Sequence, residues 1–269
     1  MTMQCKVCHD AMHQVFSALV LHKHKVAYYR CTTCGLIQTE KPYWLDEAYS
    51  DAIAMGDTGL VSRNISIALR LAPLLQLIAG RGGRYLDVAG GYGMLVRLMR
   101  DFGFDYWWYD KYCANLLAKG FEATGASAPY AAVTAFEVLE HVEDPCVFIA
   151  ETMRQHGCDT LIFSTELYVG ETAPLPTWWY YAFEGGQHIS FFQRRTLEKM
   201  AERLSLHFAT VRGIHIMSRR RLPPVWLLTL GASYLAPFLT VMIKRLRGSL
   251  TVSDNRALAQ KGADAPPEK

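Results

Sequence analysis

The chain has 269 residues, of which 51% are hydrophobic and 12% are aromatic, and its formal net charge is +3. This length accommodates one full α/β domain with small additions, and this composition fits a globular protein with a large core. So small a charge excludes the generally basic surface that binds nucleic acid. Residues 1–10 are polar and contain two cysteines, so we expect no signal peptide and a cytoplasmic location.

Two Cys-x-x-Cys pairs stand at the beginning of the chain, Cys5 with Cys8 and Cys31 with Cys34, separated by a 22-residue spacer. Four thiolates at this spacing suit a tetrahedral structural zinc ion. The spacer carries β-branched and aromatic residues, as the hairpin of a zinc ribbon would. A disulfide is disfavoured without secretion, and the nearby histidines are the alternative ligands. We therefore expect a zinc-ribbon subdomain over residues 1–40.

Residues 41–80 are expected to connect this ribbon to the main domain. The first part of the connector is aromatic and includes Tyr49. Apolar residues then recur at helical spacing over residues 63–79, which predicts a helix that packs on the sheet. A glycine-rich break at residues 80–83 ends that helix.

The central motif of the chain is a strand, a glycine-rich turn and a helix over residues 85–100. In α/β folds, a turn of this kind at a helix N-terminus receives a nucleotide-like ligand. Glycines allow the ligand to approach the backbone closely. The alternative is that the segment is a turn and nothing more. The candidate ligand-binding residues here are Asp87, Ala89, Gly90, Gly91 and Gly93.

The next strand-like run ends at Asp110, about 20 residues beyond the glycines, where an acid accepts hydrogen bonds from ribose hydroxyls. Asp87 precedes the glycines and can face a cationic ligand, which suits S-adenosylmethionine better than a pyrophosphate. These residues resemble class I S-adenosylmethionine-dependent methyltransferases, with Ala89 in place of the first glycine of the acid-x-Gly-x-Gly-x-Gly pattern. The resemblance implies an α/β fold with a Rossmann-like sheet and helices on both faces, over residues 81–217.

An acidic cluster with one histidine follows a strand predicted over residues 131–136. It runs from Glu137 through Glu140 and His141 to a helix that begins at Pro145. Ligands of α/β folds bind at the carboxyl ends of strands, and this segment resembles the post-strand motif of class I methyltransferases. We count Glu137 among the cofactor-binding residues. The alternative is a solvated loop at the entry of the helix.

Four further elements are predicted from the sequence. They are a helix over residues 111–118, a strand over residues 160–165, a helix over residues 195–207 and a last strand over residues 209–217.

A long loop over residues 174–192 is rich in aromatic residues and glycine, as a lid or substrate wall would be. It contains His188, whose imidazole titrates near neutrality and suits a general base. The alternative is that His188 only hydrogen-bonds the backbone and shapes the loop.

A zinc-binding N-terminus, a class I core and a histidine-bearing loop are together similar to the deoxysugar C-methyltransferases. In that family the loop commonly reads Tyr-His-Glu-His, and its last histidine is implicated as the base. By this resemblance His188 is the base, with Gln187 in place of the glutamate. His141 corresponds to the histidine after the fourth strand, and Tyr49 to a tyrosine that covers the cofactor.

The resemblance extends to shorter zinc-ribbon methyltransferases of surface-polysaccharide pathways. We therefore expect the acceptor to be a small molecule, a sugar or a lipid-linked glycan, and no nucleic acid. One alternative is O-methylation of a lipid or another small hydroxyl compound. A second alternative is a non-catalytic, membrane-associated scaffold.

Residues 218–250 are predicted to form a hydrophobic helical segment with basic flanks. Its uncharged core, residues 225–243, is at the lower limit for a membrane span. A helical hairpin on the cytoplasmic face of a membrane explains both basic flanks, because each can meet anionic lipid. Helices that cap the substrate site and a true span are the alternatives. The polar residues 251–269 are predicted to be a flexible tail.

Overall fold

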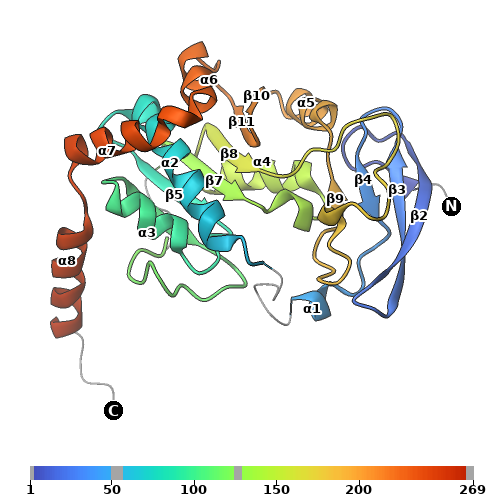
Figure 1. Cartoon of the computed structure of the whole chain (residues 1–269), viewed down its shortest axis with the longest axis horizontal. Coiled ribbons are helices and arrows are strands. Elements are labelled where there is room, and N and C mark those ends of the chain that lie inside the picture. The colour runs from blue at the N-terminus through green and yellow to red at the C-terminus, as the bar shows by residue number, and fades with distance from the viewer. Residues whose placement is uncertain (1–2, 50–56, 124–128, 265–269) are drawn as a thin grey trace. The chain divides into compact units, whose positions relative to one another are not determined.

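The computed structural model describes residues 3–49, 57–123 and 129–264 (Figure 1). Two compact units are built from interleaved parts of the chain. The first unit comprises Met1–Thr58 and Thr134–Pro223, and the second comprises Gly59–Val133 and Pro224–Lys269. Residues 50–56 of the predicted connector and residues 265–269 of the predicted tail lie outside the described residues.

The main sheet has six strands in the order β10-β11-β8-β7-β5-β6. The pair β5 and β6 is parallel, whereas β11 runs antiparallel to both β8 and β10. This mixed sheet confirms the α/β class predicted from the sequence. The strands are β5 (Arg84–Val88), β6 (Asp105–Tyr109), β7 (Ala132–Phe136), β8 (Thr160–Ser164), β10 (His207–Val211) and β11 (Ile214–Ser218).

The single last strand predicted over residues 209–217 is wrong, because the segment forms the hairpin of β10 and β11. Arg212 and Gly213 connect the two strands with φ angles of 49° and 78°. Two successive positive φ angles favour a tight hairpin turn whose twist matches that of the flanking strands.

A second sheet lies in the first unit, with the strand order β1-β2-β3-β4-β9. Its strands are β1 (Met3–Gln4), β2 (Ala11–Val20), β3 (His24–Cys31), β4 (Ile37–Thr39) and β9 (Ser190–Phe191). The antiparallel pair of β2 and β3 confirms the predicted hairpin of the spacer. Strand β9 comes from the predicted long loop and pairs with β4, placing Phe191 opposite Ile37. The ribbon and the histidine-bearing loop therefore share one sheet.

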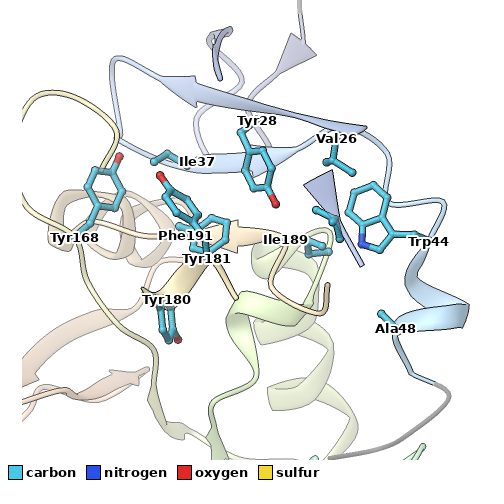
Figure 2. Packing of buried hydrophobic residues seen from close by; sticks show 11 residues of the cluster. Val26, Tyr28, Ile37, Trp44, Ala48, Tyr168, Tyr180, Tyr181, Ile189 and Phe191 are labelled. Atoms are coloured by element: carbon cyan, nitrogen blue, oxygen red, sulfur yellow. The ribbon is translucent and has the colours of Figure 1, made fainter. Parts of the chain in front are cut away.

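An aromatic core joins that sheet to the loop in the first unit (Figure 2). The Tyr181 ring packs edge-on against Phe191, with the ring centroids 4.8 Å apart, and Tyr28 also packs edge-on against Tyr181. The helices of this unit are α1 (Leu45–Ala48), η1 (Leu139–His141), α4 (Pro145–Gln155), η2 (Trp179–Tyr181) and α5 (Arg194–Arg203).

The second unit contains the predicted helix of residues 63–79 within α2. Its helices are α2 (Leu60–Ala79), α3 (Met94–Asp101), α6 (Pro224–Gly231), η3 (Ser233–Leu235), α7 (Ala236–Arg247) and α8 (Thr251–Asp264). The hydrophobic segment folds as α6, η3 and α7, and the Thr240 hydroxyl on α7 donates to the Leu69 carbonyl of α2 at 2.9 Å. Among the described residues, no helix has both the length and the apolar character needed to cross a membrane.

Two segments differ from the sequence prediction because of polar side chains. The predicted tail is helical as far as residue 264, and it is anchored by Asp254, whose two oxygens each accept a hydrogen bond from buried Arg100 at 2.8 Å. Residues 111–118 form bends and irregular backbone where we predicted a helix. The Asp110 carboxylate accepts the N–H groups of Tyr112 and Cys113, a local arrangement that competes with helix formation.

Candidate functional site

The four cysteines of the ribbon come together in the first unit. Their sulfur atoms all lie within 4.8 Å of one another, with Cys5 Sγ 3.5 Å from Cys34 Sγ and Cys8 Sγ 3.4 Å from Cys31 Sγ. A zinc–sulfur bond of about 2.3 Å places tetrahedral thiolates roughly 3.8 Å apart, so these positions fit a zinc ion. The cluster offers no histidine ligand among the described residues.

The glycine turn lies in the second unit, between β5 and α3. Three of its residues, Ala89, Gly91 and Gly93, have φ angles of 55°, 54° and 86°. The alanine therefore adopts the left-handed conformation at the position where the resembling family has glycine, at a cost of about 1–2 kcal/mol. A side chain at Gly90 would meet the Trp108 ring, because a Cβ atom there would be 2.8 Å from Trp108 Cδ1.

Asp110, which directly follows β6, connects the end of this strand to the turn by hydrogen bonds. Its Oδ2 accepts the Gly91 N–H at 2.9 Å, and its Oδ1 accepts the Tyr112 N–H at 2.7 Å. The Trp108 indole N–H donates to the Gly91 carbonyl at 2.8 Å. Asp87 is buried at the end of β5. The structure thus brings Asp87, the glycines and Asp110 together within one unit.

The acidic cluster after β7 lies in the first unit. The Ser164 hydroxyl donates to Glu137 Oε1, and the Glu137 N–H donates to the Ser164 hydroxyl at 3.1 Å. Glu140 is fully buried in η1, and Tyr180 donates its hydroxyl to Glu140 Oε1 at 2.7 Å. Burial, followed by the nearby Glu137 carboxylate, raises the pKa of Glu140 to about 8.

The two candidate histidines are also neighbours in the first unit. The ring centroids of His141 and His188 are 4.9 Å apart, and the rings are nearly perpendicular. His188 donates from Nδ1 to the Tyr180 carbonyl at 2.7 Å. The ring of Tyr49 lies 6.2 Å from that of His141. Burial, followed by the charge of His188, lowers the pKa of His141 to about 3.

The loop that carries His188 is anchored on both sides of the histidine. The Trp44 indole N–H donates to the Gly186 carbonyl at 2.8 Å, and the Gln187 amide donates to the Ala48 carbonyl at 2.8 Å. Gln187, which replaces the glutamate of the resembling family, therefore connects the loop to helix α1.

Sequence reasoning missed Tyr180, which contacts both halves of the candidate site. Its hydroxyl binds Glu140 and its carbonyl binds His188. The aromatic run of residues 178–181 was the available signal, but the sequence does not show which of these rings turns toward an acid. Glu140 was part of the acidic cluster predicted after the strand of residues 131–136, but no role was assigned to it.

Comparison with known proteins identifies the family. The model of a methyltransferase domain matches residues 63–208, which is more than half of the chain. A search of curated proteins finds no match. A solved structure of magnesium protoporphyrin IX methyltransferase from Synechocystis, with bound SAH, is 14% identical, with 65% of this chain and 93% of that chain covered and a TM-score of 0.43.

Two other solved structures have comparable likeness. An O-methyltransferase family 2 protein from Planctomyces limnophilus in complex with apigenin is 16% identical, with 65% of this chain and 66% of that chain covered and a TM-score of 0.41. The plantazolicin methyltransferase BpumL in complex with SAH is 9% identical and has a TM-score of 0.45. The match covers 67% of this chain and 95% of that chain. From the family match and the sheet, the chain belongs to the methyltransferase-domain family and has the class I methyltransferase fold.

Proposed function

We propose that the protein transfers a methyl group from S-adenosylmethionine to a small-molecule acceptor. The observation that carries this proposal is the left-handed turn of Ala89, Gly91 and Gly93, held by Asp110 at the start of α3, in a chain of the methyltransferase-domain family. A turn at a helix N-terminus presents backbone N–H groups to a carboxylate or phosphate. It thereby suits the methionine carboxylate of the cofactor.

The residues of the turn have separate roles in this proposal. Asp87 and the glycines hold the methionine portion, and Asp110 accepts a ribose hydroxyl. The Asp110 carboxylate already accepts three backbone N–H groups. An ionised carboxylate has about four acceptor positions, so it keeps the capacity for one further hydrogen bond. In the same proposal Tyr49 and Glu137 also contact the cofactor.

His188 takes the proton from the acceptor in this proposal, with His141 beside it. The hydrogen bond from His188 Nδ1 to the Tyr180 carbonyl supports this role, because it makes Nε2 the basic nitrogen of the neutral ring. Methyl transfer is an in-line displacement at the sulfonium carbon. The protein therefore accelerates it by positioning both reactants and by removing the acceptor's proton.

We propose a sugar or a lipid-linked sugar as the acceptor, as in a surface-polysaccharide or deoxysugar pathway. Exposed aromatic rings such as Trp179, at 72% exposure, offer flat faces on which a sugar ring can stack. The alternative acceptor is a lipid or another small hydroxyl compound. The four cysteines hold a structural zinc ion in this proposal, and their complete set of thiolates leaves no open position for chemistry.

The test is methyl transfer from labelled S-adenosylmethionine to a panel of nucleotide-linked and lipid-linked sugars. His188→Gln should retain cofactor binding and lower turnover by about 10²–10⁴-fold, which is the usual contribution of a general base. His207→Gln, an exposed histidine at the start of β10, is the matched control and should leave turnover unchanged. Full turnover of His188→Gln would refute the assignment of the base.

A further inference from the structure

Three side chains in the first unit form a group outside the four cysteines that has the composition of a metal site. They are Glu140 and His141 on η1 and His188 on the aromatic loop. One carboxylate oxygen and one nitrogen from each ring all lie within 4.8 Å of one another. The cysteine cluster has four protein ligands, whereas this group has three.

Two polar atoms of the group are buried and lack a hydrogen-bond partner among the described residues. They are Glu140 Oε2 and His141 Nδ1. Buried polar atoms in native proteins are nearly always satisfied, and two unsatisfied polar atoms in one place call for a shared partner. A cation is such a partner, because metal binding releases the proton of a carboxyl ligand.

The surroundings orient these ligands as the outer shell of a metal site does. Tyr180 donates its hydroxyl to the other oxygen of Glu140 at 2.7 Å, and its carbonyl accepts the Nδ1 proton of His188 at 2.7 Å. Metal-binding histidines typically donate their second ring nitrogen to a carbonyl or a carboxylate. Tyr180 thereby fixes the carboxylate and one imidazole at once.

We propose that Glu140, His141 and His188 bind a divalent transition-metal ion, and that this ion binds an oxygen of the methyl acceptor. Two imidazoles with one carboxylate favour manganese, iron, cobalt or zinc over calcium. Three protein ligands leave coordination positions open, as in catalytic metal sites. An acceptor with two adjacent oxygens, such as a vicinal diol or a hydroxy ketone, can fill two of those positions.

Binding of the acceptor to the ion rests on the proposed methyl transfer. In this scheme His188 binds the metal ion and no longer serves as the general base. The bound cation lowers the pKa of the coordinated hydroxyl, whose proton passes to water. The resulting oxyanion forms a bond to the methyl carbon while the carbon–sulfur bond breaks. The electron pair of that bond remains on sulfur, and the products are the methyl ether and S-adenosylhomocysteine.

The first test is titration with Mn²⁺ of protein that holds a single zinc ion per chain, at the four cysteines, followed by the electron paramagnetic resonance signal of the free ion. Mn²⁺ prefers oxygen and nitrogen ligands and does not displace zinc from four thiolates. One bound Mn²⁺ per chain is expected. Glu140→Gln and His188→Gln should each weaken binding at least about tenfold, whereas His207→Gln should not. The proposal would be overturned if the wild type did not bind one Mn²⁺ per chain, or if both variants bound Mn²⁺ as tightly as the wild type.

A second measurement separates this inference from the proposed function. Thermal unfolding and S-adenosylmethionine titration are run on the same variants. Glu140→Gln should fold and bind the cofactor as the wild type does, because the glycine turn is untouched. Wild-type protein that binds and uses the cofactor but binds no Mn²⁺ would refute the metal site and leave the methyltransferase proposal standing. Wild-type protein that binds Mn²⁺ and no cofactor would support the metal site and refute the proposed function.

Discussion

Tyr180 shows how one residue organises the chemical groups of the first unit. Its hydroxyl binds a buried carboxylate and its carbonyl binds an imidazole, so the positions of both side chains depend on one backbone segment. That segment is held by the aromatic core around Tyr181 and Phe191 (Figure 2). Substitutions in this core are therefore expected to affect the candidate site as well as stability.

His215 gives a prediction at the residue scale, outside the candidate site. It is buried in β11, where Nε2 donates to the Thr165 carbonyl and Nδ1 accepts from the Thr210 hydroxyl. Burial lowers the pKa of His215 to about 4. Between pH 6.5 and about 4 the unfolded chain binds a proton that the folded chain does not bind. Stability is therefore highest above pH 6.5 and falls as the pH decreases through this window.

The measurement is urea unfolding at pH 7 and at pH 5. Lowering the pH across this interval should cost about 2 kcal/mol through His215, from 1.36 kcal/mol per pKa unit. His215→Gln cannot gain this proton, so its unfolding free energy should depend on pH by about 2 kcal/mol less than that of the wild type. Identical pH dependence in the two proteins would contradict the assignment.

Sequence reasoning at this scale identified residue types and spacings but not burial. The spacing of Asp110 from the glycines placed it correctly beside the turn. The same carboxylate also binds the following backbone, which is why the helix predicted over residues 111–118 does not form. Periodicity does not reveal whether a side chain will bond its own backbone.

At the scale of elements, α7 carries an apolar stripe that the fold leaves exposed. Phe238, Val241, Met242 and Leu246 are each more than half exposed, and they recur at the spacing of one helix face. Lys244 and Arg245 at the end of the same helix are exposed, and residues 219–253 contain no acidic residue. We propose that this stripe contacts an anionic membrane surface.

Vesicle co-sedimentation tests that contact. The protein should bind phosphatidylglycerol vesicles more tightly than phosphatidylcholine vesicles. Replacing both Lys244 and Arg245 by Gln should weaken binding to the anionic vesicles by about tenfold or more, at about 1 kcal/mol for each basic residue. Phe238→Ser should weaken binding as well, whereas Leu19→Ser on β2 serves as an exposed apolar control. Equal binding by all these proteins would refute the membrane contact.

The ribbon strands, helix α2 and the strands around the glycine turn were predictable because their signals are local. Helix α8 was not, because its polar sequence is stabilised by the ion pair between Asp254 and Arg100, far apart in the chain. The pairing of β4 with β9 could not be predicted from the sequence either. A two-residue strand in a loop of glycine and aromatic residues has too little periodicity to be recognised.

For the whole molecule, the pairing of β4 with β9 ties the ribbon to the residues that surround His188. The Thr196 hydroxyl of α5 also donates to the Cys34 carbonyl at 2.7 Å. The first unit accordingly joins residues 1–58 to residues 134–223. The ribbon is thus part of the body that holds the histidines.

Removal of zinc should therefore affect more than the ribbon. A chelator, or Cys34→Ser, should lower Tm by about 10 °C or more, since a loss of about 3–5 kcal/mol has this effect in a chain of this size. Metal analysis should give at least one zinc ion per chain before chelation, and Cys158→Ser, which changes a buried cysteine outside the cluster, should retain the wild-type zinc content. Unchanged zinc content in Cys34→Ser would contradict the ligand assignment.

Binding of S-adenosylmethionine to the glycine turn can be measured by calorimetric titration of zinc-replete protein with S-adenosylmethionine and S-adenosylhomocysteine. The wild type should bind both with micromolar affinity. Asp110→Ala should weaken binding by about 10–100-fold, as expected for hydrogen bonds to a charged group, while the exposed Asp46→Ala should not. Thermal unfolding verifies that each variant is folded. Well-folded wild-type protein that binds neither compound would contradict the account.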